Sequence, residues 1–195
     1  NLVVVQARPK LYVQYHHRIL EAIEGCIPIE DIMSIDEMAC LLDRTQRTAE
    51  SATRIAQKIK TAICDQVGAC MTSSVGVSSN RLLAKLASDM QKPDGLVLLP
   101  PEHMPQAIAH LKLQDICGIG PNMAARLQRA GIHDIAALWA ADSAVLRRVW
   151  NGVTGARFHA LLHGADLPSP VHPRRSMSHQ HVLAPDERNI AKATP

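Results

Sequence analysis

Aromatic residues are scarce in this sequence of 195 residues, which contains two Trp, two Tyr and one Phe. Proteins that hold single-stranded nucleic acid by base stacking present several aromatic rings along one groove. The few rings of this chain are too widely scattered for such a platform. If the protein binds nucleic acid, we therefore expect it to contact mainly the sugar–phosphate backbone.

Disulfide pairing and membrane insertion also have little support in the sequence. The five cysteines are odd in number and include no Cys-x-x-Cys pair, which favours reduced thiols and a cytoplasmic location. No apolar run approaches the length of a membrane span, and the first residues lack the basic region of a signal peptide. Because the chain starts with Asn and a strand-like apolar run, we expect it to begin inside a domain.

Charge is nearly balanced, with a net value of +3. Residues 1–99 carry 11 basic and 11 acidic side chains, whereas residues 100–195 carry 10 and 7. This mild excess is weak evidence for a polyanionic partner. The hydrophobic content of 47% is high enough for a folded core and excludes a disordered tail.

Hydrophobic periodicity divides the chain at the Pro100-Pro101 pair. Before it, the sequence predicts helices at 11–24, 48–67 and 79–90, the last with Ser79 as N-cap, and strands at 2–5, 27–35, 38–42, 71–77 and 96–99. After it, only short helical stretches follow, up to about residue 164, and then a proline-rich linker. The sequence thus predicts an α+β fold in residues 1–99, an all-α domain in 100–166, and a linker with the start of a further domain in 167–195.

Two adjacent acids, Asp36 and Glu37, lie between two predicted strands. Adjacent acids are most often solvated turn residues, and that interpretation stays open. At a junction of packed strands, however, two carboxylates repel each other, and a divalent cation such as Mg²⁺ compensates them. Two such ions about 3.5–4 Å apart can hold the attacking and leaving oxygens of a phosphoryl transfer. The sequence therefore predicts that Asp36 and Glu37 are catalytic metal ligands and that a further carboxylate comes from elsewhere.

A basic helix face and a turn follow in the same half of the chain. Arg81 and Lys85 are four residues apart, so they share one face of the predicted helix. Such a face is commonly just solvated, but it can also face phosphates. Lys92 begins a Lys-Pro-Asp-Gly turn, from which its charge could reach a triphosphate.

A Gly-Ile-Gly sequence in the second half predicts a helix-hairpin-helix. Gly118, Ile119 and Gly120 precede a predicted helix that begins with Pro121, and Gly131 and Ile132 follow it at the expected spacing. Glycines allow close approach, and the amides of a helix N-terminus bind phosphate. The hairpin therefore predicts a DNA-binding element formed by residues 118–120 that reads no sequence. The alternative is a helix pair with a purely structural role.

Some polar residues have weaker signals. The adjacent His16 and His17 lack partners at metal-ligand spacing, which indicates polar residues at the surface or close to DNA. Asp43 follows a predicted strand and is expected to be structural rather than catalytic.

Together, four segments resemble, in order, the Y family of DNA polymerases, which copy past DNA lesions. Residues 28–37 are similar to the family's second catalytic motif, and residues 75–95 to its Val-Gly-Ile…Asn-Lys…Ala-Lys…Lys-Pro-Asp-Gly stretch. Residues 118–132 resemble the hairpin of the family's thumb, and residues 174–183 resemble the start of its little finger.

The resemblance implies that residues 1–99 are the later part of a palm, with an antiparallel sheet and helices, and that 100–166 are the thumb. It places Asp36 and Glu37 on the metal-binding pair, with two Mg²⁺ ions in the complete site. It places Lys92 against the triphosphate of the nucleotide, and Arg81 and Lys85 near the DNA and the active site. The implied partners are primer–template DNA and deoxynucleoside triphosphates, together with a sliding clamp or other repair proteins bound through regions outside this sequence.

The sequence also departs from the family pattern. The first catalytic motif and the fingers have no counterpart, and the little finger only begins. Arg81 stands where lysine is common, and Asp43 lies two residues further from Glu37 than in the common pattern. We therefore expect polymerase activity in the parent protein and none in the chain as given.

Two other functions remain open at this point. One is a non-catalytic palm-and-thumb relative that acts as a DNA-binding module or scaffold in repair, although it would not need both Asp36 and Glu37. The other is a hairpin domain fused to an unrelated α+β domain such as a nuclease, which would need more acids near Asp36.

Overall fold

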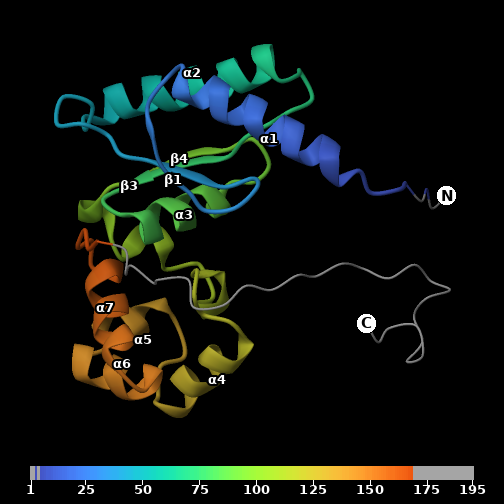
Figure 1. The fold of residues 1–195 in the computed structure, drawn as a ribbon. Helices are drawn as coiled ribbons and strands as arrows, with labels where there is room; N and C mark the ends of the chain where they lie inside the picture. The colour runs from blue at the N-terminus through green and yellow to red at the C-terminus, as the bar shows by residue number, and fades with distance from the viewer. Residues whose placement is uncertain (1–2, 4, 169–195) are drawn as a thin grey trace, which may run out of the picture.

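The computed structural model describes residue 3 and residues 5–168 of the chain. Its first half contains, in order, α1 (Pro9–Glu24), β1 (Ile29–Ile32), β2 (Met38–Cys40), α2 (Ala49–Gln66), β3 (Val75–Ser78), α3 (Arg81–Met90) and β4 (Leu96–Leu99). The second half contains only helices, the 3₁₀ turns η1 (Pro101–His103), η2 (Gln106–Ile108) and η3 (Leu113–Asp115) and the α-helices α4 (Pro121–Arg129), α5 (Ile135–Ala140), α6 (Ser143–Trp150) and α7 (Val153–Leu162). The predicted change from mixed α and β structure to all-α structure is therefore present (Figure 1).

Helices α1 and α2 lie side by side over the β1–β2 hairpin (Figure 1). Thr48 caps α2 by accepting a hydrogen bond from the Ser51 amide at 3.2 Å. The apolar faces of the two helices close a small core with the hairpin, formed by Ala22, Ile23, Ile27, Ile63 and Val67. This core positions the turn between β1 and β2.

The β3–α3–β4 unit differs from the antiparallel sheet that the resemblance implied. Strands β1 and β2 are antiparallel, but β3 and β4 pair in parallel, because α3 carries the chain back between them. The two pairs form separate two-stranded sheets in the described residues. Helix α3 packs tightly on β3: a Cβ built on Gly76 would lie 2.0 Å from the carbonyl oxygen of Ala84, so only glycine fits there.

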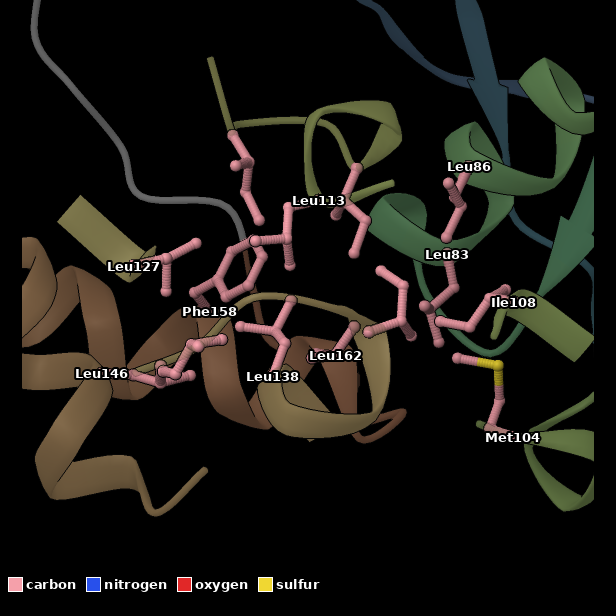
Figure 2. Close-up of a cluster of buried hydrophobic side chains, with 14 of the residues drawn as sticks. Leu83, Leu86, Met104, Ile108, Leu113, Leu127, Leu138, Leu146, Phe158 and Leu162 are labelled. Carbon is pink, nitrogen blue, oxygen red and sulfur yellow. The ribbon is translucent and has the colours of Figure 1, made fainter. Parts of the chain in front are cut away.

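A second, larger core joins α3 to the helical half of the chain. Figure 2 shows Leu83 and Leu86 of α3 converging with Phe158 and Leu162 of α7, and all four are buried. Asn80, which is 7% exposed, strengthens the junction: its side-chain amide donates to the carbonyl oxygens of Leu161 at 2.7 Å and Ala165 at 2.9 Å. The core thus continues across residues 99 and 100, where the sequence predicted a domain boundary, and that boundary stays a prediction.

Several local predictions need correction. Asn80, not Ser79, caps α3: its side-chain oxygen accepts from the Leu83 amide at 3.0 Å. The amide nitrogen of the same side chain also reaches Leu161 of α7. Val3 and Val5 are not in a strand, and the rest of that predicted strand lies outside the described residues. The same holds for residues 169–195, which include nearly all of the predicted linker and little-finger start. Among the described helices, none has both the length and the apolar character that crossing a membrane requires.

Candidate active site

Asp36 and Glu37 lie in the turn that connects β1 to β2. The Glu37 carbonyl oxygen closes this turn by accepting from the amides of Met33 at 2.8 Å and Ser34 at 3.1 Å. The Ser34 hydroxyl donates to Asp36 Oδ1 at 2.6 Å, which orients that carboxylate. The sequence predicted the two acids at a strand junction, and the structure places both at the tip of the hairpin.

Two long-range contacts hold the β1–β2 hairpin in place. The imidazole Nδ1 of His16, on α1, lies 2.7 Å from the carbonyl oxygen of Ile35, the residue before Asp36. Arg81, at the start of α3, forms an ion pair of 2.7 Å with Asp31 on β1. Arg81 thus fastens the β1–β2 hairpin to α3, and its predicted position near the DNA and the active site stays a prediction.

Lys85 faces Glu37 across the gap between α3 and the hairpin. Its ammonium lies 2.5 Å from Glu37 Oε1 and 3.2 Å from Asp89 Oδ1. The hydrogen bond to Glu37 is the main reason that the pKa of Lys85 is raised, and partial burial opposes this only in part. Lys85 was predicted to lie near the DNA and the active site; the structure places it directly against Glu37, and its contact with DNA stays a prediction.

Lys92 also contacts Asp89, with its ammonium 2.7 Å from the same Oδ1 atom. Partial burial would raise the pKa of Asp89, but hydrogen bonds from Lys92 and Lys85 outweigh it and lower that pKa. Glu37, Lys85, Asp89 and Lys92 therefore form a row of alternating charges. The row extends from the acidic turn to the Lys-Pro-Asp-Gly turn.

The turn that carries Lys92 is anchored from α2. The Lys60 ammonium donates to the Asp94 carbonyl at 2.9 Å and also pairs with the Asp94 carboxylate. The hydrogen bond from Lys60 to the carboxylate is the main reason that the pKa of Asp94 is lowered. A Cβ on Gly95 would lie 1.8 Å from the Gln91 carbonyl oxygen, so this position also excludes a side chain.

The chemistry of the acidic turn suits a hard divalent cation, but the described residues supply only part of a complete ligand set. Asp36 is exposed and the Glu37 side chain is 43% exposed, so both carboxylates are accessible. Carboxylate oxygens are the ligands that Mg²⁺ prefers. Within residues 3 and 5–168, no group of three or more His, Cys, Asp or Glu side chains is arranged to hold a metal. The two acids therefore fit a metal site that a further ligand completes.

The loop of residues 118–120, which the sequence predicted as part of a helix-hairpin-helix, follows η3, a 3₁₀ turn, where that prediction requires a helix. Gly118 has a φ of +91°, a conformation that favours glycine, and a Cβ on Gly120 would meet no atom within 4 Å. In the described structure, no hydrogen-bond acceptor is found for the amides of Gly118 and Gly120. Ile119 differs, because its side chain is 2% exposed and its amide donates to the Ile116 carbonyl at 3.0 Å. Ile119 can therefore hold the loop but has no amide hydrogen free for a phosphate.

Sequence reasoning missed three residues that shape the site. His16 was interpreted as a surface residue, Asn80 was passed over, and Asp89 received no role. Only Asp89 left a usable local signal, since it stands four residues after Lys85 and three before Lys92, the spacings of ion pairs on a helix. The contacts of His16 and Asn80 depend on elements that lie far away in the sequence.

Similarity to known proteins supports the resemblance to Y-family DNA polymerases independently of the site geometry. Residues 1–89 match the impB/mucB/samB family. A DNA polymerase IV of Moorella thermoacetica is 35% identical over 95% of this chain, and one of Halorhodospira halophila is 42% identical over 82% of it. These alignments cover 47% and 45% of the two relatives, so the chain spans about half the length of the curated relatives it matches.

Solved structures of DNA polymerases are also similar to this chain in fold. An insertion ternary complex of Dbh DNA polymerase has a TM-score of 0.73 and 25% identity, over 85% of this chain and 48% of that one. DinB from Sulfolobus solfataricus has a TM-score of 0.66 and 25% identity, over 83% and 47%. A chimeric polymerase described as Y-family also matches, with a TM-score of 0.72 over 87% of this chain and 49% of that one.

The fold thus matches the palm and thumb regions of Y-family polymerases, as the resemblance implied. The resemblance to the Y family of DNA polymerases is confirmed, and this chain is homologous to the parts of those proteins that it covers.

Proposed function

We propose that the full-length gene product is a DNA-directed DNA polymerase that adds nucleotides opposite damaged template bases. One observation supports this most strongly. Helix α3 brings Lys85 against Glu37, and Asp89 near the end of α3 contacts both Lys85 and Lys92. An acidic pair next to two ammonium groups is the charge arrangement that nucleotidyl transfer from a nucleoside triphosphate to a primer hydroxyl needs, with pyrophosphate as the leaving group. The relatives named DNA polymerase IV are in keeping with this activity.

In this proposal, Asp36 and Glu37 hold Mg²⁺, with two ions in the complete site. Bound Mg²⁺ would neutralise charge on the phosphates and orient the reacting oxygens. The Ser34 hydroxyl orients Asp36, and the His16 imidazole holds the turn in place. The role of the chain itself is thus to keep two carboxylates fixed and accessible at one end of the hairpin.

The remaining residues act on the two substrates. Lys92 binds the triphosphate of the incoming nucleotide, since its side chain is 55% exposed and sits on an anchored turn. Gly118 and Gly120 direct backbone amides to a phosphate of the primer–template duplex, which gives binding that does not depend on base sequence. The five free cysteines suit a reducing compartment, so we place the protein in the cytoplasm.

Primer extension by the full-length gene product tests the proposal. With Mg²⁺, the wild type should extend a primer on undamaged and abasic templates, and Asp36→Asn or Glu37→Gln should slow extension by roughly 100-fold or more, the effect of losing one main electrostatic stabiliser. Duplex affinity should change little in either variant. Glu30→Gln is the matched control, because this exposed acid lies on β1 of the same hairpin. A folded wild type that binds DNA but never extends a primer would instead support the non-catalytic DNA-binding alternative.

A further inference from the structure

Asp89 brings two ammonium groups together at a single oxygen atom. Lys92 and Lys85 approach Asp89 Oδ1 at 2.7 Å and 3.2 Å. Both ammonium groups contact one atom, so they lie within about 6 Å of each other, although like charges at that distance repel. Without the carboxylate, the Lys92 side chain would turn away into solvent, because it has several freely rotating bonds, whereas Lys85 would stay paired with Glu37.

Helix stability does not explain an acid at this position. Asp89 is the penultimate residue of α3, and negative charge in the last turn of a helix is unfavourable. Its side chain is 31% exposed, so it also loses part of its hydration. The favourable interactions that offset these costs are the contacts with the two lysines.

The neighbouring elements limit how far the carboxylate can move. Its second oxygen, Oδ2, lies 4.0 Å from the sulfur of Cys117, the residue directly before the Gly118–Gly120 hairpin. On the opposite side, Lys85 is held by Glu37. Asp89 therefore lies between the turn of Asp36 and Glu37, the loop of residues 118–120 and the turn that carries Lys92.

We propose that Asp89 is a positioning residue that gathers Lys85 and Lys92 into a paired cationic seat for the phosphates of the incoming nucleoside triphosphate. This inference rests on the proposed function. A lysine ammonium has three N–H donors, so each lysine can keep its contact with Asp89 while it donates to a phosphate oxygen. Asp89 acts through the lysines and does not touch the nucleotide.

The test measures nucleotide binding without chemistry. The full-length gene product is bound to a primer–template whose primer ends in a dideoxynucleotide, and the Kd of the correct deoxynucleoside triphosphate is measured with Mg²⁺. Asp89→Asn should raise this Kd by about tenfold, roughly the loss of one charge-assisted contact, and leave duplex affinity unchanged. Asp89→Glu keeps the charge and should stay within about threefold of the wild type, because its longer side chain can still reach both lysines. Glu50→Gln is the control, because it removes one carboxylate and one helical ion pair, with Arg54, from a remote surface.

A double-mutant cycle separates positioning from a structural effect. If Asp89 acts through Lys92, Asp89→Asn should weaken nucleotide binding less in a Lys92→Ala background than in the wild type. Equal fold-changes in both backgrounds would overturn the proposal. So would an unchanged or tighter Kd in Asp89→Asn, or an Asp89→Glu variant as weak as Asp89→Asn. If Asp89→Asn fails to fold, Asp89→Ala replaces it, with the same expected rise in Kd and the same outcomes that overturn the proposal.

The outcomes distinguish this inference from the proposed function. A wild type that binds the correct nucleotide but cannot extend an ordinary primer would overturn the polymerase proposal and leave Asp89 testable by Kd. An active wild type with no effect of Asp89→Asn would overturn only the role of Asp89. Failure of the wild type to bind nucleotide would overturn both.

Discussion

At the scale of single residues, the basic side chains of α3 and the following turn have three different environments. Arg81 pairs with Asp31 and holds the hairpin, and Lys85 pairs with Glu37 inside the candidate site. Lys92 is the most exposed of the three, with 55% of its side chain accessible. Of these residues, Lys92 is therefore the one best able to reach a substrate without breaking a contact that holds the fold.

We predict that Lys92→Ala in the full-length gene product raises the KM for nucleotide or lowers kcat, by about 10- to 100-fold in kcat/KM. This is the range expected for losing a hydrogen bond to a charged group, which contributes roughly 1.5–3 kcal/mol. Steady-state primer extension measures the effect, and affinity for primer–template should stay within about twofold. Lys58→Ala, which removes an exposed lysine of α2, is the control. A loss of DNA affinity with normal nucleotide kinetics would assign Lys92 to the DNA-binding surface instead.

At the scale of elements, the hairpin before α4 combines two glycines with different constraints. Gly118 needs its left-handed backbone, with φ at +91°. Gly120 has an ordinary φ of −77° and open space around it, so alanine fits there without strain. Substitution at Gly120 therefore tests contact with a ligand rather than folding.

We predict that Gly120→Ala weakens binding of duplex DNA by about tenfold, because the methyl group keeps a phosphate from the backbone amides. Fluorescence anisotropy should show an equal loss on two unrelated duplexes. The salt dependence should stay the same, because amides are neutral and release few counterions. Gly25→Ala is the control, since its φ is −66° and its nearest contact is 3.5 Å away. Unchanged affinity would leave the hairpin a purely structural element, and a loss on one duplex alone would indicate sequence reading.

At the scale of the whole molecule, α3 connects the two halves of the chain. It packs on β3 and β4, and its Leu83 and Leu86 belong to the same buried core as the side chains of the helical half. Asn80 adds hydrogen bonds to the end of α7. The helix that carries Lys85 and Asp89 therefore packs directly against the helical half.

We predict that Leu86→Ala loosens both halves of this shared core. Removing a fully buried leucine side chain costs about 2–5 kcal/mol, and amide hydrogen exchange should accelerate in α7 as much as in β3. Ile63→Ala is the matched control, because Ile63 belongs to the separate core of α1 and α2 and should leave α7 protected. Faster exchange confined to β3, α3 and β4 would mean that the halves unfold independently, as the predicted boundary at residue 100 implies.

Local sequence patterns were enough to predict most elements of this protein. The helices over residues 9–24 and 49–66, the turn that carries Asp36 and Glu37, and the all-helical second half follow from periodicity and turn residues. These features depend on neighbours within a few positions, which the sequence displays directly. The order of the motifs was also sufficient for the resemblance to Y-family polymerases, which the comparisons confirm.

Tertiary structure alone decided which charged groups meet. Lys85 reaches Glu37 across 48 residues, and Asn80 reaches Leu161 across 81. It also decided the parallel pairing of β3 with β4 and the core that crosses the predicted boundary. Such contacts depend on how whole elements pack, and hydrophobic patterning shows which face is buried but not what lies against it. Asp36, Glu37, Lys85 and Lys92 could therefore be proposed from local sequence, whereas their connection through Asp89 emerged only when α3, the β1–β2 hairpin and the Lys92 turn were brought together.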